Sequence, residues 1–205
     1  MILKGDREVE WSWIVANLPK TRSKILDVGC TDSIISPTMV RLEHVVFGID
    51  IRDPLFKMSD FTFIKADIMD TVFFEKKIFD TIVVCSTIEH IGLSERYGSY
   101  EKENGDIDTM TKLRDLLVQE GTLLLTIPVG QDKIYLPMHR IYGVARIALL
   151  LQNYDIIKEE YWEKIEKEEL GQWSQCDKEK ALDTETLDDY YCLGLFVLRG
   201  KNERV

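Results

Sequence analysis

Short apolar segments that end in polar residues alternate with helical patterns along this chain, and this alternation constrains its fold more than any other feature. Five such segments are "KILDV" (24–28), "HVVFGID" (44–50), "FTFIKAD" (61–67), "FDTIVVCS" (79–86) and "GTLLLTIPV" (121–129). Apolar residues recur at helical spacing beside them, at 7–18, 33–42 and 106–120. Continuous apolar strands that alternate with helices are typical of a parallel sheet covered on both faces, so we predict an α/β fold.

The last third of the chain is expected to close the sheet differently. Residues 140–153 have a helical pattern, and residues 154–165 alternate in part and predict a strand. The polar stretch 166–187 is interpreted as a surface insertion, and the apolar segment 190–200 as the last strand. Because no clear helix separates these two strands, we predict that they form a terminal antiparallel pair.

Length and composition predict a single domain that spans residues 1–205 and opens with a helix within residues 1–20. The chain has 205 residues, of which 45% are hydrophobic and 30% are charged, as expected for a chain with an ordinary packed core. Lys and Arg total 26 against 36 Asp and Glu, which gives a net charge of −10. Because phosphate neutralisation needs clustered Lys and Arg, we expect no nucleic-acid partner.

The sequence also predicts a cytoplasmic protein. Its start, "MILKGDREVE", is charged and lacks an apolar signal core, and its longest apolar runs are far shorter than the ~20 residues of a membrane helix. The four cysteines have no C-x-x-C spacing and are interpreted as reduced thiols: Cys30, Cys85, Cys176 and Cys192. Because no apolar run is long enough to span a membrane, we expect no membrane association. The oligomeric state is unknown at this level.

Polar residues follow the predicted strands where an open α/β sheet binds ligands, beyond the carboxyl ends of its strands. They are Asp27, Gly29, Cys30, Thr31 and Ser33 after the first strand, Asp50 after the second, Asp67 after the third, and Cys85, Ser86, Thr87, Glu89 and His90 after the fourth. A carboxylate at the end of the second strand accepts hydrogen bonds from both ribose hydroxyls of an adenosine ligand, and we predict this role for Asp50.

The loop after the first strand separates two classes of adenosine ligand. A dinucleotide pyrophosphate needs close backbone approach along G-x-G-x-x-G, but "ILDVGCTDS" (25–33) offers only Gly29, with Thr31 and Ser33 where other loops carry glycine. The backbone of such a loop and the following helix N-terminus can meet a carboxylate, and Asp27 can meet an ammonium. The loop therefore favours the methionine end of S-adenosylmethionine (SAM).

Ordered motifs extend this interpretation. "ILDVGC", "FGID", "ADI", "FDTIVVCSTIEHIG" and "LLVQEGTLLLTIPV" resemble those of class I SAM-dependent methyltransferases over about residues 24–130. "IEHIGLSERYG", "GDIDTMTKLRDLL", "TIPVG" and "MHRIYG" resemble a poorly characterised family of methyltransferase-like proteins. The resemblance implies a Rossmann-like methyltransferase fold, with a mostly parallel seven-stranded sheet, helices on both faces and a terminal antiparallel strand pair. It also implies SAM as the cofactor.

The same resemblance implies roles for individual residues. Gly29 and Thr31 line the methionine end, Asp50 binds the ribose, Asp67 with Ile68 meets the adenine, and Ser86 and Thr87 flank the sulfonium. The full set predicted to bind the cofactor is Asp27, Gly29, Cys30, Thr31, Asp50, Ile51, Asp67, Ile68, Ser86 and Thr87.

Three residues are candidates for catalysis. His90 is the predicted general base because imidazole titrates near neutral pH, and Glu89 and His139 are expected beside it. Some methyltransferases carry E-x-x-E-H here and bind a divalent metal, but Ser86 replaces the first Glu, so we predict no metal. The N-P-P-Y loop of enzymes that methylate amide or base nitrogens is absent from "CSTI".

The predicted function is therefore methyl transfer from SAM to a hydroxyl or carboxyl oxygen of a small molecule or sugar. Two alternatives stay open. An NAD-dependent oxidoreductase shares the acid at the strand end, although the missing glycines count against it. A non-catalytic methyltransferase-like domain that binds a partner fits the changed glycine loop and the polar residues 166–187.

Overall fold

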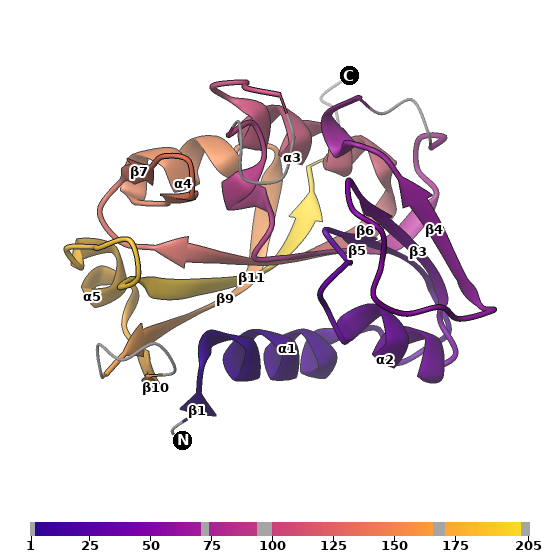
Figure 1. Ribbon diagram of the computed structural model, residues 1–205, viewed down its shortest axis with the longest axis horizontal. Coiled ribbons are helices and arrows are strands. Elements are labelled where there is room, and N and C mark those ends of the chain that lie inside the picture. Colours follow the sequence, from indigo (N-terminus) through magenta and orange to yellow (C-terminus); the bar gives the residue numbers. More distant parts are fainter. Residues whose placement is uncertain (1–2, 71–73, 94–99, 166–170, 202–205) are drawn as a thin grey trace.

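A computed structural model describes residues 3–70, 74–93, 100–165 and 171–201 of the chain. Within them, nine strands form one sheet in the order β1-β10-β9-β11-β6-β5-β2-β3-β4 (Figure 1). Their bounds are β1 Leu3–Lys4, β2 Lys24–Val28, β3 Val45–Asp50, β4 Phe61–Lys65, β5 Phe79–Cys85, β6 Leu117–Val129, β9 Tyr154–Lys164, β10 Gln172–Cys176 and β11 Cys192–Gly200. A separate hairpin is formed by β7 (Lys133–Tyr135) and β8 (His139–Ile141).

The prediction of a mostly parallel sheet of seven strands is wrong in the number of strands and in their balance. Four parallel ladders join β4, β3, β2, β5 and β6. Four antiparallel ladders join β6, β11, β9, β10 and β1. The seven predicted strands are neighbours from β9 to β4, and β9 with β11 forms the predicted antiparallel pair. The short strands β10 and β1 extend the sheet beyond β9 because that edge still offers backbone hydrogen bonds.

Helices cover both faces of the sheet, as predicted (Figure 1). Side chains of α1 (Asp6–Asn17) and α2 (Ile35–Arg41) pack on one face. Side chains of α3 (Gly105–Leu116), α4 (Val144–Leu150) and α5 (Lys178–Asp183) pack on the other. Among the described residues, no helix combines the length and the apolar character that crossing a membrane requires.

Prolines fix the ends of the first two helices. The residue before a proline disfavours the helical conformation, and α1 accordingly ends at Asn17, because Leu18 is extended and precedes Pro19. Pro37 lies in the first turn of α2, where its missing N–H breaks no intrahelical bond, so the helix begins at Ile35 and not at the expected residue 33. These two helices frame the loop that follows β2.

The stretch predicted as a surface insertion, 166–187, contains regular structure. Residues 166–170 lie outside the described residues. Beyond them, β10 pairs with β9 and β1, and Trp173 on β10 is buried. The helix α5 follows, with Ala181 fully buried against the main cluster.

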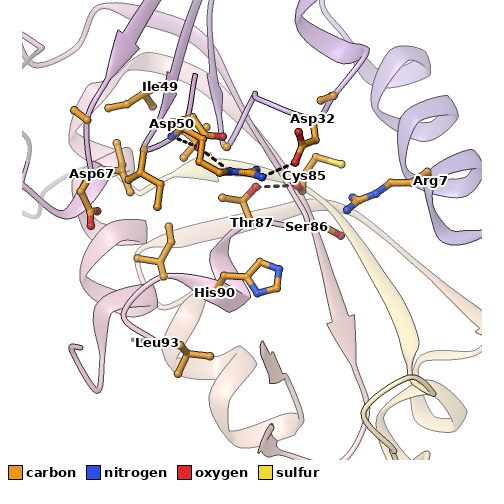
Figure 2. A pocket seen from close by; sticks show the side chains of 18 of the residues that line it. Arg7, Asp32, Ile49, Asp50, Asp67, Cys85, Ser86, Thr87, His90 and Leu93 are labelled. Atoms are coloured by element: carbon orange, nitrogen blue, oxygen red, sulfur yellow. Dashed lines mark hydrogen bonds and ion pairs between the residues drawn. The ribbon is translucent and has the colours of Figure 1, made fainter. Parts of the chain in front are cut away.

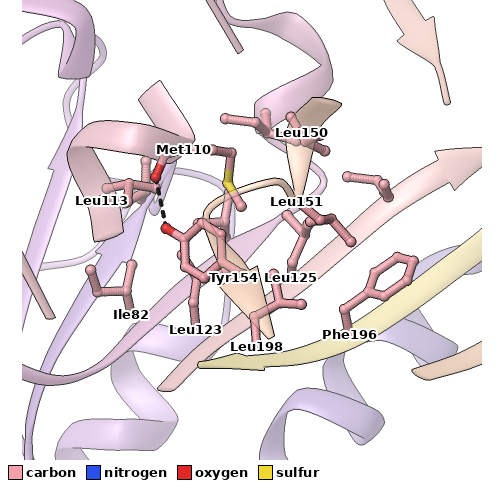
Figure 3. Close-up of a cluster of buried hydrophobic side chains, with 14 of the residues drawn as sticks. Ile82, Met110, Leu113, Leu123, Leu125, Leu150, Leu151, Tyr154, Phe196 and Leu198 are labelled. Carbon is pink, nitrogen blue, oxygen red and sulfur yellow. Dashed lines mark hydrogen bonds between the residues drawn. The ribbon is translucent and has the colours of Figure 1, made fainter. Parts of the chain in front are cut away.

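Two apolar clusters occupy the two faces of the sheet. Adjacent residues such as Ile82 and Val83 of β5, and Leu123 and Leu124 of β6, belong to opposite clusters, so the middle of each strand is apolar and buried on both faces. Figure 3 shows the cluster under α3, where the hydroxyl of Tyr154 donates to the Met110 carbonyl at 2.7 Å. This bond satisfies the one polar atom of a side chain that is otherwise packed among leucines.

Candidate active site

A cavity of about 170 Å³ opens beyond the carboxyl ends of β2, β3 and β5, where α/β sheets bind ligands (Figure 2). It is bordered by the first turns of α1 and by the short helices η1 (Ile68–Asp70) and η2 (Ile88–His90). The lining residues predicted from sequence are Gly29, Asp50, Ile51, Asp67, Ile68, Ser86, Thr87 and His90. Those not predicted to bind ligand include Arg7, Trp11, Asp32, Arg52 and Leu93.

The remaining predicted residues lie behind this lining. Asp27, Cys30, Thr31, Glu89 and His139 are all buried, and none of these five is among the residues that line the cavity. They are packed close to it in the fold, at the same strand ends or on the facing hairpin.

Gly29 turns the chain between β2 and the cavity. Its φ is +78°, a conformation that costs other residues about 1–2 kcal/mol. A Cβ built there would lie 2.2 Å from Oγ1 of Thr87, so the two strand-end loops approach each other closely only because residue 29 is a glycine. The glycine is therefore required by the packing of the site.

Thr31 takes the place of a second glycine without filling the cavity. Its side chain is buried, and its Oγ1 donates to the Arg52 carbonyl at 3.1 Å. Its backbone N–H donates to Oδ2 of Asp50 at 3.1 Å. The threonine thus joins the first loop to the end of β3, and the departure from a glycine-rich pattern leaves the cavity open.

Asp50 is held by the backbone at the end of β3. Besides the bond from Thr31, its Oδ1 accepts the Arg52 N–H at 2.9 Å. The Arg52 guanidinium bridges to Asp32, with Nη1 2.7 Å from Oδ2, and lies 3.7 Å from Oδ1 of Asp50 (Figure 2). Each carboxylate oxygen of Asp50 has two lone pairs, so the side chain retains acceptor capacity toward a ligand.

Asp27 lies beneath the loop, behind the lining of the cavity, and its role toward a ligand ammonium stays a prediction. Its Oδ2 accepts the hydroxyl of Ser36 at 2.6 Å, and it is 1% exposed. Burial raises the pKa of Asp27 to about 7, partly offset by the Ser36 hydrogen bond. A cation in the neighbouring cavity would favour its charged form.

The buried carboxylate of Glu10 was not predicted from sequence. It belongs to α1 and is 0% exposed, and its Oε1 accepts the hydroxyls of Ser86 and Thr126, the latter at 2.7 Å. Its Oε2 accepts Nη1 of Arg7 at 3.0 Å. Burial raises the pKa of Glu10, and these three donors act against that shift.

A sequence signal for Glu10 existed. Val9, Glu10, Trp13 and Ile14 are the buried residues of α1, so the glutamate lies within the apolar stripe of the helix. A charged residue in such a stripe indicates a buried partner. Arg7 has no comparable signal, because its position depends on how α1 crosses the strand ends.

His90 and its neighbours face the cavity from η2. Its Nδ1 lies 2.7 Å from the Met138 carbonyl, which can only accept, so Nδ1 carries a proton. Its Nε2 lies 3.7 Å from Oε1 of Glu89. The rings of His90 and His139 are 6.3 Å apart, edge to face. In the described part of the chain, no group of three or more His, Cys, Asp or Glu side chains is arranged to hold a metal ion.

A fully buried arginine anchors η2 from behind. Nη1 of Arg140 donates to the Ile91 carbonyl at 2.6 Å and to the Glu89 carbonyl at 3.4 Å. Its Nη2 donates to the Glu103 carbonyl at 3.2 Å, and its Nε lies 3.8 Å from Oδ2 of Asp106. One side chain of the β7–β8 hairpin therefore fixes the backbone that carries His90.

Comparison with protein families gives one match. Residues 42–187 fit the family described as "Caenorhabditis protein of unknown function, DUF268", which is more than half of the chain. The chain belongs to this family. The DUF268 match includes Asp50, Ser86 and His90 but begins after α1 and the glycine loop. A comparison with curated proteins gave no match.

Solved structures resemble this DUF268 protein in fold. N-methyltransferase NodS from Bradyrhizobium japonicum, solved with S-adenosylhomocysteine (SAH), has 15% identity and a TM-score of 0.62, covering 96% of this chain and 88% of NodS. The Burkholderia thailandensis 1,6-didemethyltoxoflavin-N1-methyltransferase, solved with its substrate and SAH, has 11% identity and a TM-score of 0.60 (95% and 76% covered). A TehB-like SAM-dependent methyltransferase from Corynebacterium glutamicum has 16% identity and a TM-score of 0.55 (94% and 87% covered). The chain has the Rossmann-like fold of SAM-dependent methyltransferases.

Proposed function

We propose that this protein is an SAM-dependent methyltransferase that transfers a methyl group to an oxygen of a small molecule or sugar. One observation carries the proposal: four of the predicted acids and hydroxyls, which follow three successive strands, line a single cavity, and they are Asp50, Asp67, Ser86 and Thr87. The fold and the SAH-bound structures that share it support SAM as the cofactor.

The cavity suggests how the cofactor lies. The methionine end would rest on Gly29 and Ser33, with the ribose against Asp50. Adenine would lie between Ile51 and Ile68, beside Asp67. The sulfonium would then approach Ser86 and Thr87. The Arg52 guanidinium lies next to the Asp50 carboxylate, so the Arg52 side chain would have to move to accommodate the ribose.

The acceptor would enter from the side of α1 and η2. Arg7, Trp11 and His90 line this part of the cavity, with Glu89 and His139 behind it. Close alignment of the acceptor with the sulfonium supplies much of the rate in methyl transfer, and these residues would provide it. We keep His90, Glu89 and His139 as the residues predicted to act on the acceptor side. Two of the compared structures are N-methyltransferases; we propose oxygen here because the N-P-P-Y loop is absent.

Calorimetry with SAH tests the proposal. The native chain should bind SAH, and Asp50→Ala should weaken binding by roughly 100-fold, because two hydrogen bonds from the ribose to a charged group are lost at about 1.5 kcal/mol each. Asp53→Asn is the control, because its exposed carboxylate is on the same loop and pairs with Lys65 outside the cavity. Failure of the native chain to bind millimolar SAH would contradict the proposal.

The same sample separates the alternatives. Fluorescence titration with NADH would detect an oxidoreductase. Unchanged thermal stability with and without SAM would favour a non-catalytic domain that binds a partner. We also propose that the protein acts on a small-molecule acceptor in the cytoplasm, with no nucleic-acid or membrane partner.

A further inference from the structure

Glu10 and Ser86 form a hydrogen-bonded pair at the cavity, beside the position proposed for the sulfonium. Ser86 lines the cavity, and its hydroxyl donates to Oε1 of Glu10, which no solvent reaches. A buried carboxylate is unfavourable unless donors surround it. Thr126 and Arg7 supply further hydrogen-bond donors, so the buried carboxylate of Glu10 is stabilised where it lies.

The backbone of Ser86 is held so that its hydroxyl meets Glu10. Its φ is +42°, which is unusual for a residue that is not glycine. Its N–H donates to both the carbonyl and the Oγ1 of Thr126, at 3.1 Å each. Strained backbone that the surrounding structure over-determines is common where geometry serves function. The strain and the buried carboxylate are independent observations on the same residue.

Methyl transfer to a hydroxyl releases a proton that must leave the site. The new O–CH₃ bond forms as the S–CH₃ bond breaks, and its electron pair passes to sulfur. The sulfonium loses its positive charge in that step. If a nearby carboxylate takes the acceptor's proton, it loses a negative charge at the same time, so no net charge is created in the buried site.

We propose that the acceptor is a hydroxyl group and that its proton passes through the Ser86 hydroxyl to the carboxylate of Glu10. The acceptor O–H donates to Oγ of Ser86, which passes its own proton to Oε1 of Glu10. The products are a methyl ether, SAH and protonated Glu10, which later loses its proton to solvent. A carboxylate acceptor carries no proton at neutral pH and would need no such path. The inference rests on the proposed function.

His90 is less suited to this task. Its Nδ1 carries a proton toward the Met138 carbonyl, so only Nε2 could accept one, and Nε2 lies 3.7 Å from Oε1 of Glu89, a carboxyl group that favours a proton on that nitrogen. We therefore assign to His90 contact with the acceptor molecule, and to Glu10 acceptance of the proton that the hydroxyl releases. Variants of Glu10 and His90 distinguish which of the two groups takes the proton.

Other charged and titratable groups lie near Glu10, and those that change their charge near neutral pH would affect a measurement made as a function of pH. The groups that interact electrostatically with Glu10 come from α1, the end of β5 and the residue before β11: Asp6, Arg7, Cys85 and Tyr191. Glu89 of η2 acts on two of these groups, Arg7 and Tyr191. Burial raises the pKa of Cys85 and of Tyr191, so neither is charged at neutral pH. Glu10 is then the group expected to change its charge when a cation enters beside Ser86.

The experiment compares the affinities of SAM and SAH as a function of pH. The two ligands share the amino, carboxylate and adenosine groups, so their affinity ratio isolates the sulfonium charge. At low pH, Glu10 is protonated and SAM binding must expel that proton. The preference for SAM should therefore rise with pH, by up to about tenfold per pH unit, and become constant once Glu10 is ionised in the free protein.

Three variants locate the group. Glu10→Gln should make the ratio independent of pH. His90→Ala should keep the pH dependence. Asp27→Asn is the matched control, because Asp27 is also a buried acid with a serine donor. It should keep the pH dependence too, since we place Asp27 toward the ligand's ammonium, which SAM and SAH share. A constant ratio in the native chain would overturn the inference, even if Glu10→Gln failed to fold. So would loss of the pH dependence in His90→Ala. If neither ligand bound, the proposed function would fail, and this inference with it.

Discussion

Gly29 is the residue on which the first loop of the site depends. Gly29→Ala would force an alanine to φ +78° and place its Cβ against Thr87. We expect a loss of about 2–4 kcal/mol in the free energy of unfolding, and at least roughly tenfold weaker SAH binding, since the loop must move away from the cavity. Urea denaturation and calorimetry measure the two effects.

Gly200→Ala is the matched control for this prediction. It lies at the end of β11, and its added Cβ would come no closer than 3.2 Å to the flexible Arg114 side chain. Its stability and SAH affinity should change little. Equal effects of the two substitutions would show that Gly29 has no special role.

Single residues of the site were predictable only where their position in the chain fixes their position in space. Asp50, Asp67 and Ser86 follow apolar strands, and parallel strands bring their carboxyl ends to one edge. Glu10 meets Ser86 and Thr126 across separations of 76 and 116 residues. Those contacts depend on the path of α1 over the sheet, which no local pattern specifies.

The short helix η2 depends on Arg140, which holds its backbone from the neighbouring hairpin. Arg140→Met would remove bonds to three carbonyls, and we expect a loss of about 3 kcal/mol in the free energy of unfolding. The backbone N–H groups of His90, Ile91 and Leu93 bond within η2 and the turn that follows, and should exchange hydrogen faster.

Arg146→Met separates this local effect from general destabilisation. Arg146 also pairs with Asp106 and bonds the Glu103 carbonyl, and both of these partners lie outside η2. Its loss should lower stability without faster exchange at residues 90–93. Slow exchange there in Arg140→Met would refute the anchoring role.

Elements were predictable where they are long and periodic. All seven predicted strands are in the sheet, and most of them, such as β2, β5 and β11, bury a continuous apolar run. β1 and β10 were missed because "LK" and "QWSQC" are short and mostly polar, and they join the sheet through backbone bonds at its edge. The helix expected to reach residue 120 ends at Leu116, because Leu117 already pairs with Phe79 of β5.

The stability of the whole molecule should carry the signature of its buried acids. Folding raises the pKa of Asp27 from 3.8 to about 7, so the folded state holds a proton that the unfolded state releases. Stability then falls as pH rises between those values. The expected fall is on the order of 4 kcal/mol, from about 1.4 kcal/mol per pH unit. Asp27→Asn should lack this contribution. The free energy of unfolding of the native chain, minus that of the variant, should therefore be larger at pH 4 than at pH 7.

Asp60→Asn is the control, because Asp60 also has a serine donor, Ser59 Oγ at 3.2 Å, but is exposed. Its stability should follow the native curve across pH, measured by urea denaturation at each value. A native curve parallel to that of Asp27→Asn would refute the prediction. Saturating SAH should reduce this pH dependence, because its ammonium, placed as we propose, stabilises the ionised form of Asp27. The loss of stability toward pH 7 should then be smaller with SAH than without it, because the ligand supplies the counter-charge that the empty fold lacks.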